Sequence, residues 1–136
     1  MKRVLVDTGP LVAMLSAADE HHAACVEALR HLPSPLLSCW PVITEAAWLL
    51  RAYPRAVQQL LKSMDHGFLE LPPLASSEGK AIADIMKTYS DIRPQLADAT
   101  LVYLAHRHRI DTIFTLDHRD FSVYRSMKKR AFKLVP

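Results

Sequence analysis

The chain alternates between short runs of hydrophobic residues and longer segments in which hydrophobic residues recur every three or four positions. The short runs have the length of buried strands and predict strands at residues 4–6, 36–39, 68–71, 112–116 and 132–135. The longer segments have the period of a helix and predict a short helix from Gly9 and longer ones at residues 21–32, 42–53, 55–64, 77–89 and 96–109. The polar residues DHRD, at 117–120, predict a turn.

This order of elements predicts the fold class. Strands separated by helices are joined by crossovers, which place neighbouring strands parallel and cover both faces of the sheet. We therefore expect an α/β fold, a three-layer α/β/α sandwich with a central, mostly parallel sheet of four to five short strands. With 136 residues, half of them hydrophobic, the chain is expected to form a single domain over residues 1–136.

The lengths of the hydrophobic segments and the spacing of the cysteines indicate where in the cell the protein is located. No segment approaches the roughly 18 uninterrupted apolar residues of a membrane helix. The two cysteines, Cys25 and Cys39, lack metal-ligand spacing and are expected to be packing residues in a reducing compartment. We therefore expect a cytoplasmic protein with no membrane contact.

Two carboxylates stand directly after predicted strands. Asp7 ends the run VLV, and Asp117 follows TIFTL. In open parallel sheets, ligands bind in the crevice outside the carboxyl ends of the strands. Both side chains are therefore expected at the same edge of the sheet.

Two further carboxylates, Glu45 and Asp98, lie on the hydrophobic stripes of predicted helices. A charge on such a stripe faces the core and needs a partner. Asp98 also stands at the start of its helix, where the helix dipole favours an anion. The hydrophobic residues on these stripes are Val42, Ala46 and Leu49 beside Glu45, and Leu101, Val102 and Ala105 beside Asp98.

Each of these four carboxylates, taken alone, also fits a turn, a helix cap or an ion pair. Together they would repel one another and raise one another's pKa, unless a multivalent cation joined them. No His or Cys cluster accompanies them in the sequence, so the donors are all oxygen. Such a set suits Mg²⁺ or Mn²⁺ better than zinc.

Four segments carry these carboxylates: VDTGPL with Asp7, ITEAAWLL with Glu45, LADATLVYLAHRHR with Asp98 and IFTLDHRDF with Asp117. In this order they resemble the PIN-domain nucleases, and most of all the VapC-type toxins of toxin-antitoxin modules. Each motif alone is weak, but the four together span nearly the whole chain. The resemblance implies a PIN-like sandwich and a Mg²⁺- or Mn²⁺-dependent endoribonuclease.

The resemblance also implies roles for individual residues. It assigns the four carboxylates to the acidic catalytic and metal-binding cluster. Asp120 matches a position that is often acidic but less diagnostic. Thr8 and Thr115 match the hydroxyl residues beside the first and last carboxylates.

The partners implied by the resemblance are an RNA substrate, a second copy in a homodimer and a cognate VapB-like antitoxin whose tail occupies the acidic groove. For the antitoxin contacts we favour the hydrophobic helices that follow Pro41 and Pro54, which contain Trp48 and Leu60. The aromatic residues near predicted helices are better explained by core packing or a protein interface than by base stacking: Trp40, Trp48, Tyr53 and Tyr103.

Positive charge is in modest excess, with 17 basic and 14 acidic residues. When the four site carboxylates are set aside, 10 acidic residues remain, and the excess favours a surface that binds a polyanion. Each basic residue also fits an ordinary solvated surface. The candidates for RNA binding are Arg93, Arg119, Arg125, Lys128 and Lys129.

Three other functions fit parts of this sequence. An aspartic protease would pair Asp7 of Asp-Thr-Gly with the same residue of a second chain, but it would be rich in strands. A phosphatase with an Asp nucleophile would usually have a second Asp two residues later, where Gly9 stands. The more serious alternative is a PIN fold that serves as a binding or regulatory module with little or no nuclease activity.

Overall fold

The computed structural model describes residues 3–136 and contains a parallel sheet of five strands in the order β3-β2-β1-β4-β5. Leu5 pairs with Leu37 on one side and with Ile113 on the other, so β1 lies at the centre. The strands are β1 (Leu5–Val6), β2 (Leu36–Leu37), β3 (Leu69–Glu70), β4 (Thr112–Phe114) and β5 (Lys133–Val135).

The chain changes direction across the sheet after β3. It runs outward from β1 to β2 and β3, and then returns to β4 and β5 on the other side of β1. The carboxyl ends of β1 and β4 therefore lie next to each other at a topological switch point. Open α/β sheets bind ligands at such points.

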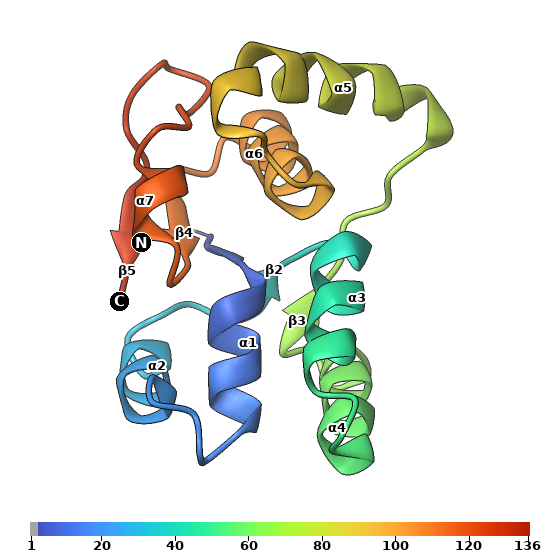
Figure 1. Cartoon of the computed structure of the whole chain (residues 1–136), viewed down its shortest axis with the longest axis vertical. Coiled ribbons are helices and arrows are strands. Elements are labelled where there is room, and N and C mark those ends of the chain that lie inside the picture. Colours follow the sequence, from blue (N-terminus) through green and yellow to red (C-terminus); the bar gives the residue numbers. More distant parts are fainter. Residues whose placement is uncertain (1–2) are drawn as a thin grey trace.

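Helices cover both faces of this sheet (Figure 1). Helices α5 and α6 lie on one side of the strands, and α1, α2 and α4 lie on the other. Helix α3 contacts α1, α4 and α6, so it joins the two helical layers. The bounds are α1 (Thr8–Leu15), α2 (His22–Leu29), α3 (Trp40–Leu49), α4 (Pro54–Asp65), α5 (Gly79–Thr88), α6 (Leu96–His108) and α7 (His118–Phe121), with 3-10 turns η1 (Ser76–Glu78) and η2 (Ser90–Ile92). The predicted three-layer α/β/α sandwich is confirmed.

The core explains why the strands are short and apolar. Both residues of β1 and all three of β4 are buried, because helices cover both faces of the sheet. Helix α6 carries more buried residues than any other helix, and its predicted stripe of Leu101, Val102 and Ala105 is fully buried. Cys25 and Cys39 are buried, free thiols, as expected of packing residues.

Several local predictions were wrong. The polar segment after β4 was expected to be a turn, but it forms α7, because the side chain of Asp117 accepts a hydrogen bond from the backbone of Asp120 and caps the helix. Leu49 was expected on the core stripe of α3, yet it is 54% exposed. Trp40, Trp48 and Tyr53 are exposed as well, which excludes the core-packing alternative for these three residues.

None of the helices in residues 3–136 combines the length and the hydropathy needed to cross a bilayer.

Candidate active site

Asp7 and Asp117 lie at the ends of the two neighbouring central strands. Val6 of β1 pairs with Phe114 of β4, and the backbone N–H of Asp7 donates to the Phe114 carbonyl at 2.9 Å. Asp7 is the N-cap of α1, and Asp117 is the N-cap of α7. The strand pairing therefore brings together two carboxylates that are distant in the sequence.

Thr115 connects these two acids. Its hydroxyl donates to Asp7 Oδ2 at 2.9 Å. The Thr115 hydroxyl oxygen in turn accepts a hydrogen bond from the backbone N–H of Asp117 at 3.0 Å. Asp7 is 7% exposed. Burial raises the pKa of Asp7, as do the charges of Glu45 and Asp117, while the hydrogen bonds with the Thr8 backbone and Thr115 oppose the rise.

Gly9 explains the third position of the Asp-Thr-Gly segment. A Cβ atom on Gly9 would meet the side chain of Leu116 at 3.3 Å, which is tighter than most such contacts. Glycine therefore lets the first turn of α1 lie against the segment between β4 and Asp117. The glycine of this tripeptide therefore allows the start of α1 to pack closely against Leu116, next to Asp117.

Asp98 enters the same region from the first turn of α6. It is 9% exposed, and its Oδ2 accepts a hydrogen bond from the Tyr124 hydroxyl at 3.3 Å. Burial, followed by the charges of Asp7 and Asp117, raises the pKa of Asp98 to about 7. The dipole of α6 favours an anion here, but burial and like charges outweigh it.

Asp120 is closer to the centre of the site than the sequence suggested. Oxygen atoms of Asp98, Asp117 and Asp120 all lie within 4.8 Å of one another. Asp117 Oδ1 accepts the Asp120 backbone N–H at 3.1 Å, so the short helix α7 holds both residues at its start. The sequence placed Asp120 in a secondary position, whereas the structure places it in the tightest group of carboxylates found among residues 3–136.

Glu45 approaches this group from α3. It is half-buried, and its charge contributes to the raised pKa of Asp7, so it faces the same site. Val42 and Ala46 on its stripe are buried, as expected. Asp7 and Glu45 lie outside the 4.8 Å group; the charge of Asp7 acts on Asp98, and the charge of Glu45 acts on Asp7.

The donor set fits a hard divalent cation. The side chains that converge here offer carboxylate oxygens, and burial together with their mutual repulsion favours the protonated forms of Asp7 and Asp98 in the absence of a compensating charge. The Thr8 hydroxyl, next to Asp7, is buried and has no hydrogen-bond partner in residues 3–136. An unpaired buried hydroxyl and clustered acids are both features that a hydrated cation would relieve.

Two further side chains lie at this site, although no pattern in the sequence predicts them there. Tyr124 is fully buried against Asp98, and burial and that carboxylate raise the pKa of its phenol, which keeps it protonated. Cys39, after β2, is close enough to Asp7 and Asp98 for their charges to help raise its pKa to about 12, after burial. Both residues stand in segments where only the three-dimensional packing shows their neighbours.

The basic candidates for RNA binding are exposed, but they are not equivalent. Arg93 and Lys129 have left-handed backbone conformations, with φ values of 50° and 61°. Arg125 is engaged by its own turn, since its Nη1 donates to three backbone carbonyls within 3.1 Å. Arg119 and Lys128 are exposed on either side of that turn.

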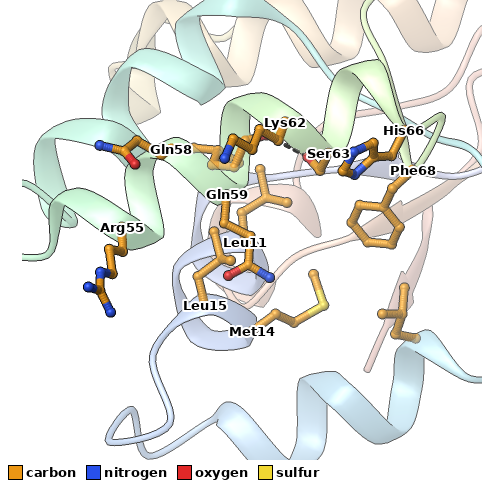
Figure 2. Close-up of a pocket in the computed structure, with 12 residues that line it drawn as sticks. Leu11, Met14, Leu15, Arg55, Gln58, Gln59, Lys62, Ser63, His66 and Phe68 are labelled. Carbon is orange, nitrogen blue, oxygen red and sulfur yellow. Dashed lines mark hydrogen bonds between the residues drawn. The ribbon is translucent and has the colours of Figure 1, made fainter.

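Two hollows have linings that include none of Asp98, Asp117 and Asp120. The α1–α4 pocket has an apolar wall formed by Leu11, Met14 and Leu15 of α1, and a basic edge formed by Arg55 and Lys62 of α4 (Figure 2). The second is a shallow hollow lined by Trp40, Trp48 and Leu96, with Glu45 among its lining residues. We call these three hydrophobic residues the aromatic patch.

The chain belongs to the PIN-domain family, whose model matches residues 4–126. It is 33% identical to ribonuclease VapC26 of Mycobacterium tuberculosis over 135 residues, which is 98% of this chain and 100% of that protein. Its fold is similar to the crystal structure of VapC20 of Mycobacterium tuberculosis, a sarcin-ricin loop cleaving toxin, with a TM-score of 0.77. That match covers 85% of this chain and 91% of the other at 15% identity, so it shows the fold alone.

Proposed function

We propose that this protein is a VapC-type, metal-dependent endoribonuclease that hydrolyses phosphodiester bonds in RNA. The observation that carries the proposal is the group of carboxylates at the carboxyl ends of β1 and β4, in a PIN domain whose relative VapC26 is named a ribonuclease. An RNA substrate also implies action in the cytoplasm.

The proposed metal ligands are Asp7, Glu45, Asp98 and Asp117, with Asp120 close enough to take part directly or through water. Because all of these donors are oxygen, Mg²⁺ or Mn²⁺ is the expected ion. A bound divalent cation supplies two effects in phosphodiester hydrolysis, a lower pKa for a water molecule and neutralisation of charge on the phosphate. The protein's contribution is to hold the acids close together and oriented, and a bound cation would favour the ionised forms of Asp7 and Asp98, whose pKa values the protein raises.

Individual side chains have separate tasks in this scheme. Thr115 orients Asp7 through its hydroxyl and fixes the backbone of Asp117. The carboxylates repel a phosphate unless a cation is bound, so substrate binding is coupled to metal binding. The chemistry needs no 2′-hydroxyl, and the preference for RNA must therefore come from how the strand is held. We assign that task to the exposed residues Arg93, Arg119, Lys128 and Lys129, with Arg125 supporting its own turn.

An antitoxin is the proposed inhibitory partner, and the α1–α4 pocket is its proposed docking site. The apolar wall from α1 and the basic edge from α4 suit an amphipathic segment with acidic side chains. Leu60 lines this pocket but is 1% exposed, so charging it would damage the core. Met14→Glu, at a half-buried position, is the better test: it should abolish inhibition by a co-expressed antitoxin and leave RNA cleavage intact.

A homodimer is the second proposed assembly, formed through the aromatic patch. Trp40 and Trp48 lie two turns apart on one face of α3 and are 60% and 63% exposed, beside Leu96 at 54%. Exposed aromatic side chains gathered on one surface are typical of protein interfaces.

The activity is tested by incubating purified protein with structured RNAs, including tRNA and ribosomal RNA, in Mg²⁺, Mn²⁺ or EDTA. We expect cleavage that requires a divalent ion and that falls at least about 100-fold in Asp7→Asn and Asp98→Asn. Asp84→Asn, on an exposed position of α5, is the matched control and should cleave normally. If no RNA is cut at stoichiometric enzyme and Mn²⁺ does not bind, the protein is a PIN-fold binding or regulatory module.

A further inference from the structure

Tyr124 is a fully buried residue whose hydroxyl points at the acidic group. The side chain is 0% exposed, and its hydroxyl donates to Asp98 Oδ2 at 3.3 Å. The hydrogen bonds of residues 3–136 leave the other oxygen of Asp98 without a protein donor. One oxygen of this carboxylate is therefore occupied by the protein and the other is free for a further contact, in a side chain that has an oxygen within 4.8 Å of oxygens of Asp117 and Asp120.

Two aromatic rings fix the position of the Tyr124 ring. Tyr89 packs edge-on against it with ring centroids 5.0 Å apart and an interplanar angle of 85°. Phe121 of α7 makes a similar contact at 5.2 Å and 70°. Such edge-to-face packing restricts the movement of a buried ring, so it holds the hydroxyl oxygen of Tyr124 in place beside Asp98.

The backbone next to Tyr124 is also attached to the surrounding helices. The Arg125 N–H donates to the Tyr89 hydroxyl at 3.1 Å, and His106 of α6 donates through Nε2 to the Arg125 carbonyl at 2.8 Å. These contacts fasten the segment after α7 to α6. Since Asp117 is the N-cap of α7 and this segment follows α7, the same contacts help to hold Asp117 and Asp120 near Asp98.

We propose that Tyr124 is a positioning residue for the metal site: it orients Asp98 by holding Oδ2, so that the free oxygen faces Asp117 and Asp120. The inference rests on the proposed function, because it assumes that these carboxylates bind a divalent cation. Groups that hydrogen-bond a ligating side chain typically contribute about 10- to 100-fold to metal affinity. Tyr124 should therefore affect metal binding more than it affects folding.

The test is Mn²⁺ binding to the purified, RNA-free protein at fixed pH, followed by electron paramagnetic resonance of the free ion or by calorimetry. Tyr124→Phe keeps the ring and its two aromatic contacts and removes only the hydroxyl. Tyr103→Phe is the matched control, since Tyr103 lies on α6 and its hydroxyl donates to Glu78 at 2.8 Å, away from the acidic group. Thermal unfolding in EDTA checks that both variants fold.

We expect Tyr124→Phe to weaken Mn²⁺ binding about 10-fold or more, with Tyr103→Phe unchanged. We also expect raised Mn²⁺ concentrations to restore RNA cleavage by Tyr124→Phe, because a loss of metal affinity can be overcome by mass action and a damaged fold cannot. Equal Mn²⁺ affinity in Tyr124→Phe and wild type, or an equal loss in Tyr103→Phe, would overturn the role of Tyr124. Absence of Mn²⁺ binding by the wild-type protein would instead overturn the proposed function.

Discussion

Thr115 and Asp7 are 108 positions apart in the sequence, yet the Thr115 hydroxyl donates directly to Asp7 Oδ2 at 2.9 Å. The contact crosses between the ends of β1 and β4, and it is buried. The same hydroxyl oxygen accepts the backbone N–H of Asp117. A single side chain thus fixes the geometry of two acids, and its removal leaves a buried carboxylate with one donor fewer.

Thr115→Val should therefore weaken both the site and the fold. Loss of a hydrogen bond to a buried carboxylate, together with an unpaired N–H at Asp117, should lower the free energy of unfolding by about 1–3 kcal/mol. Cleavage at limiting Mn²⁺ should fall by about 10-fold or more. Chemical denaturation and initial cleavage rates measure the two effects.

Thr112→Val is the control for this prediction. Thr112 is also a buried threonine of the β4 region, but its hydroxyl contacts Asp111 at 3.2 Å, before the strand rather than at the acidic group. This variant should retain full Mn²⁺-dependent activity. An equal loss of activity in both variants would show that Thr115 acts only through strand stability.

The raised pKa of Asp98 predicts an unusual pH dependence of stability in the metal-free protein. Asp98 has a pKa of about 7 in the folded protein, against 3.8 as its ordinary value, and Asp7, Asp117 and Asp120 are the charges that face it. Between about pH 4 and 7 the folded state retains a proton that the unfolded state has released. This group therefore favours folding at low pH, and its contribution is lost as pH rises through 7.

The measurement is thermal or chemical unfolding in EDTA from pH 4.5 to 8, comparing wild type with Asp98→Asn. The free energy of unfolding of Asp98→Asn should exceed that of wild type by an amount that grows with pH and reaches on the order of 2–4 kcal/mol at pH 8. Added Mn²⁺ should stabilise the wild-type protein at pH 8, because the cation binds the ionised form of the folded state. A difference that does not vary with pH would contradict the raised pKa.

The structure and the sequence give Asp120 and Glu45 different importance for metal binding, and the two rankings can be compared by experiment. The family resemblance placed Glu45 with the main acids and Asp120 in a second group, whereas in the structure an oxygen of Asp120 lies within 4.8 Å of oxygens of Asp98 and Asp117. We expect Asp120→Asn to weaken Mn²⁺ binding at least as much as Glu45→Gln does. Calorimetric titration of both variants measures this, and a clearly larger loss in Glu45→Gln would favour the ranking from sequence.

Much of the fold and part of the site follow from local patterns. Asp7 and Asp117 could be placed because each ends a buried run, and the carboxyl ends of parallel strands share one edge. Asp98 could be placed because its neighbours at helical spacing are all hydrophobic, and these neighbours are buried. In each case the local sequence pattern is enough to predict where the side chain lies, without knowledge of contacts between distant segments.

The remaining features depend on contacts that no local pattern records. Asp120 joins the tight group only because Asp117 caps a helix in a segment that reads as a polar turn. Tyr124 reaches Asp98 across a gap of 26 positions in the sequence. Helix α3 is hydrophobic on several sides, so its pattern cannot separate the buried Ala46 from the exposed Trp48 and Leu49.

The exposed Trp48 provides the test of self-association. One face of its ring is covered by the Arg51 guanidinium, which lies 3.9 Å from the ring centroid, while 63% of the residue remains exposed. Trp48→Glu should therefore change the free energy of unfolding of the monomer by less than about 1 kcal/mol. If the aromatic patch is buried between two copies, the charge would be placed in an apolar interface, and the dimer should dissociate to monomers.

Sedimentation equilibrium across a range of protein concentrations measures this outcome. Leu61→Glu is the matched control, since Leu61 is also a hydrophobic residue exposed on a helix, at 43%, but it is not part of the aromatic patch. We expect Leu61→Glu to keep the wild-type mass and Trp48→Glu to halve it. A wild-type protein that is monomeric at all concentrations would rule out the dimer. A Trp48→Glu variant that stays dimeric would rule out this surface as the interface, because an interface built on the aromatic patch cannot tolerate a buried, unpaired carboxylate at its centre.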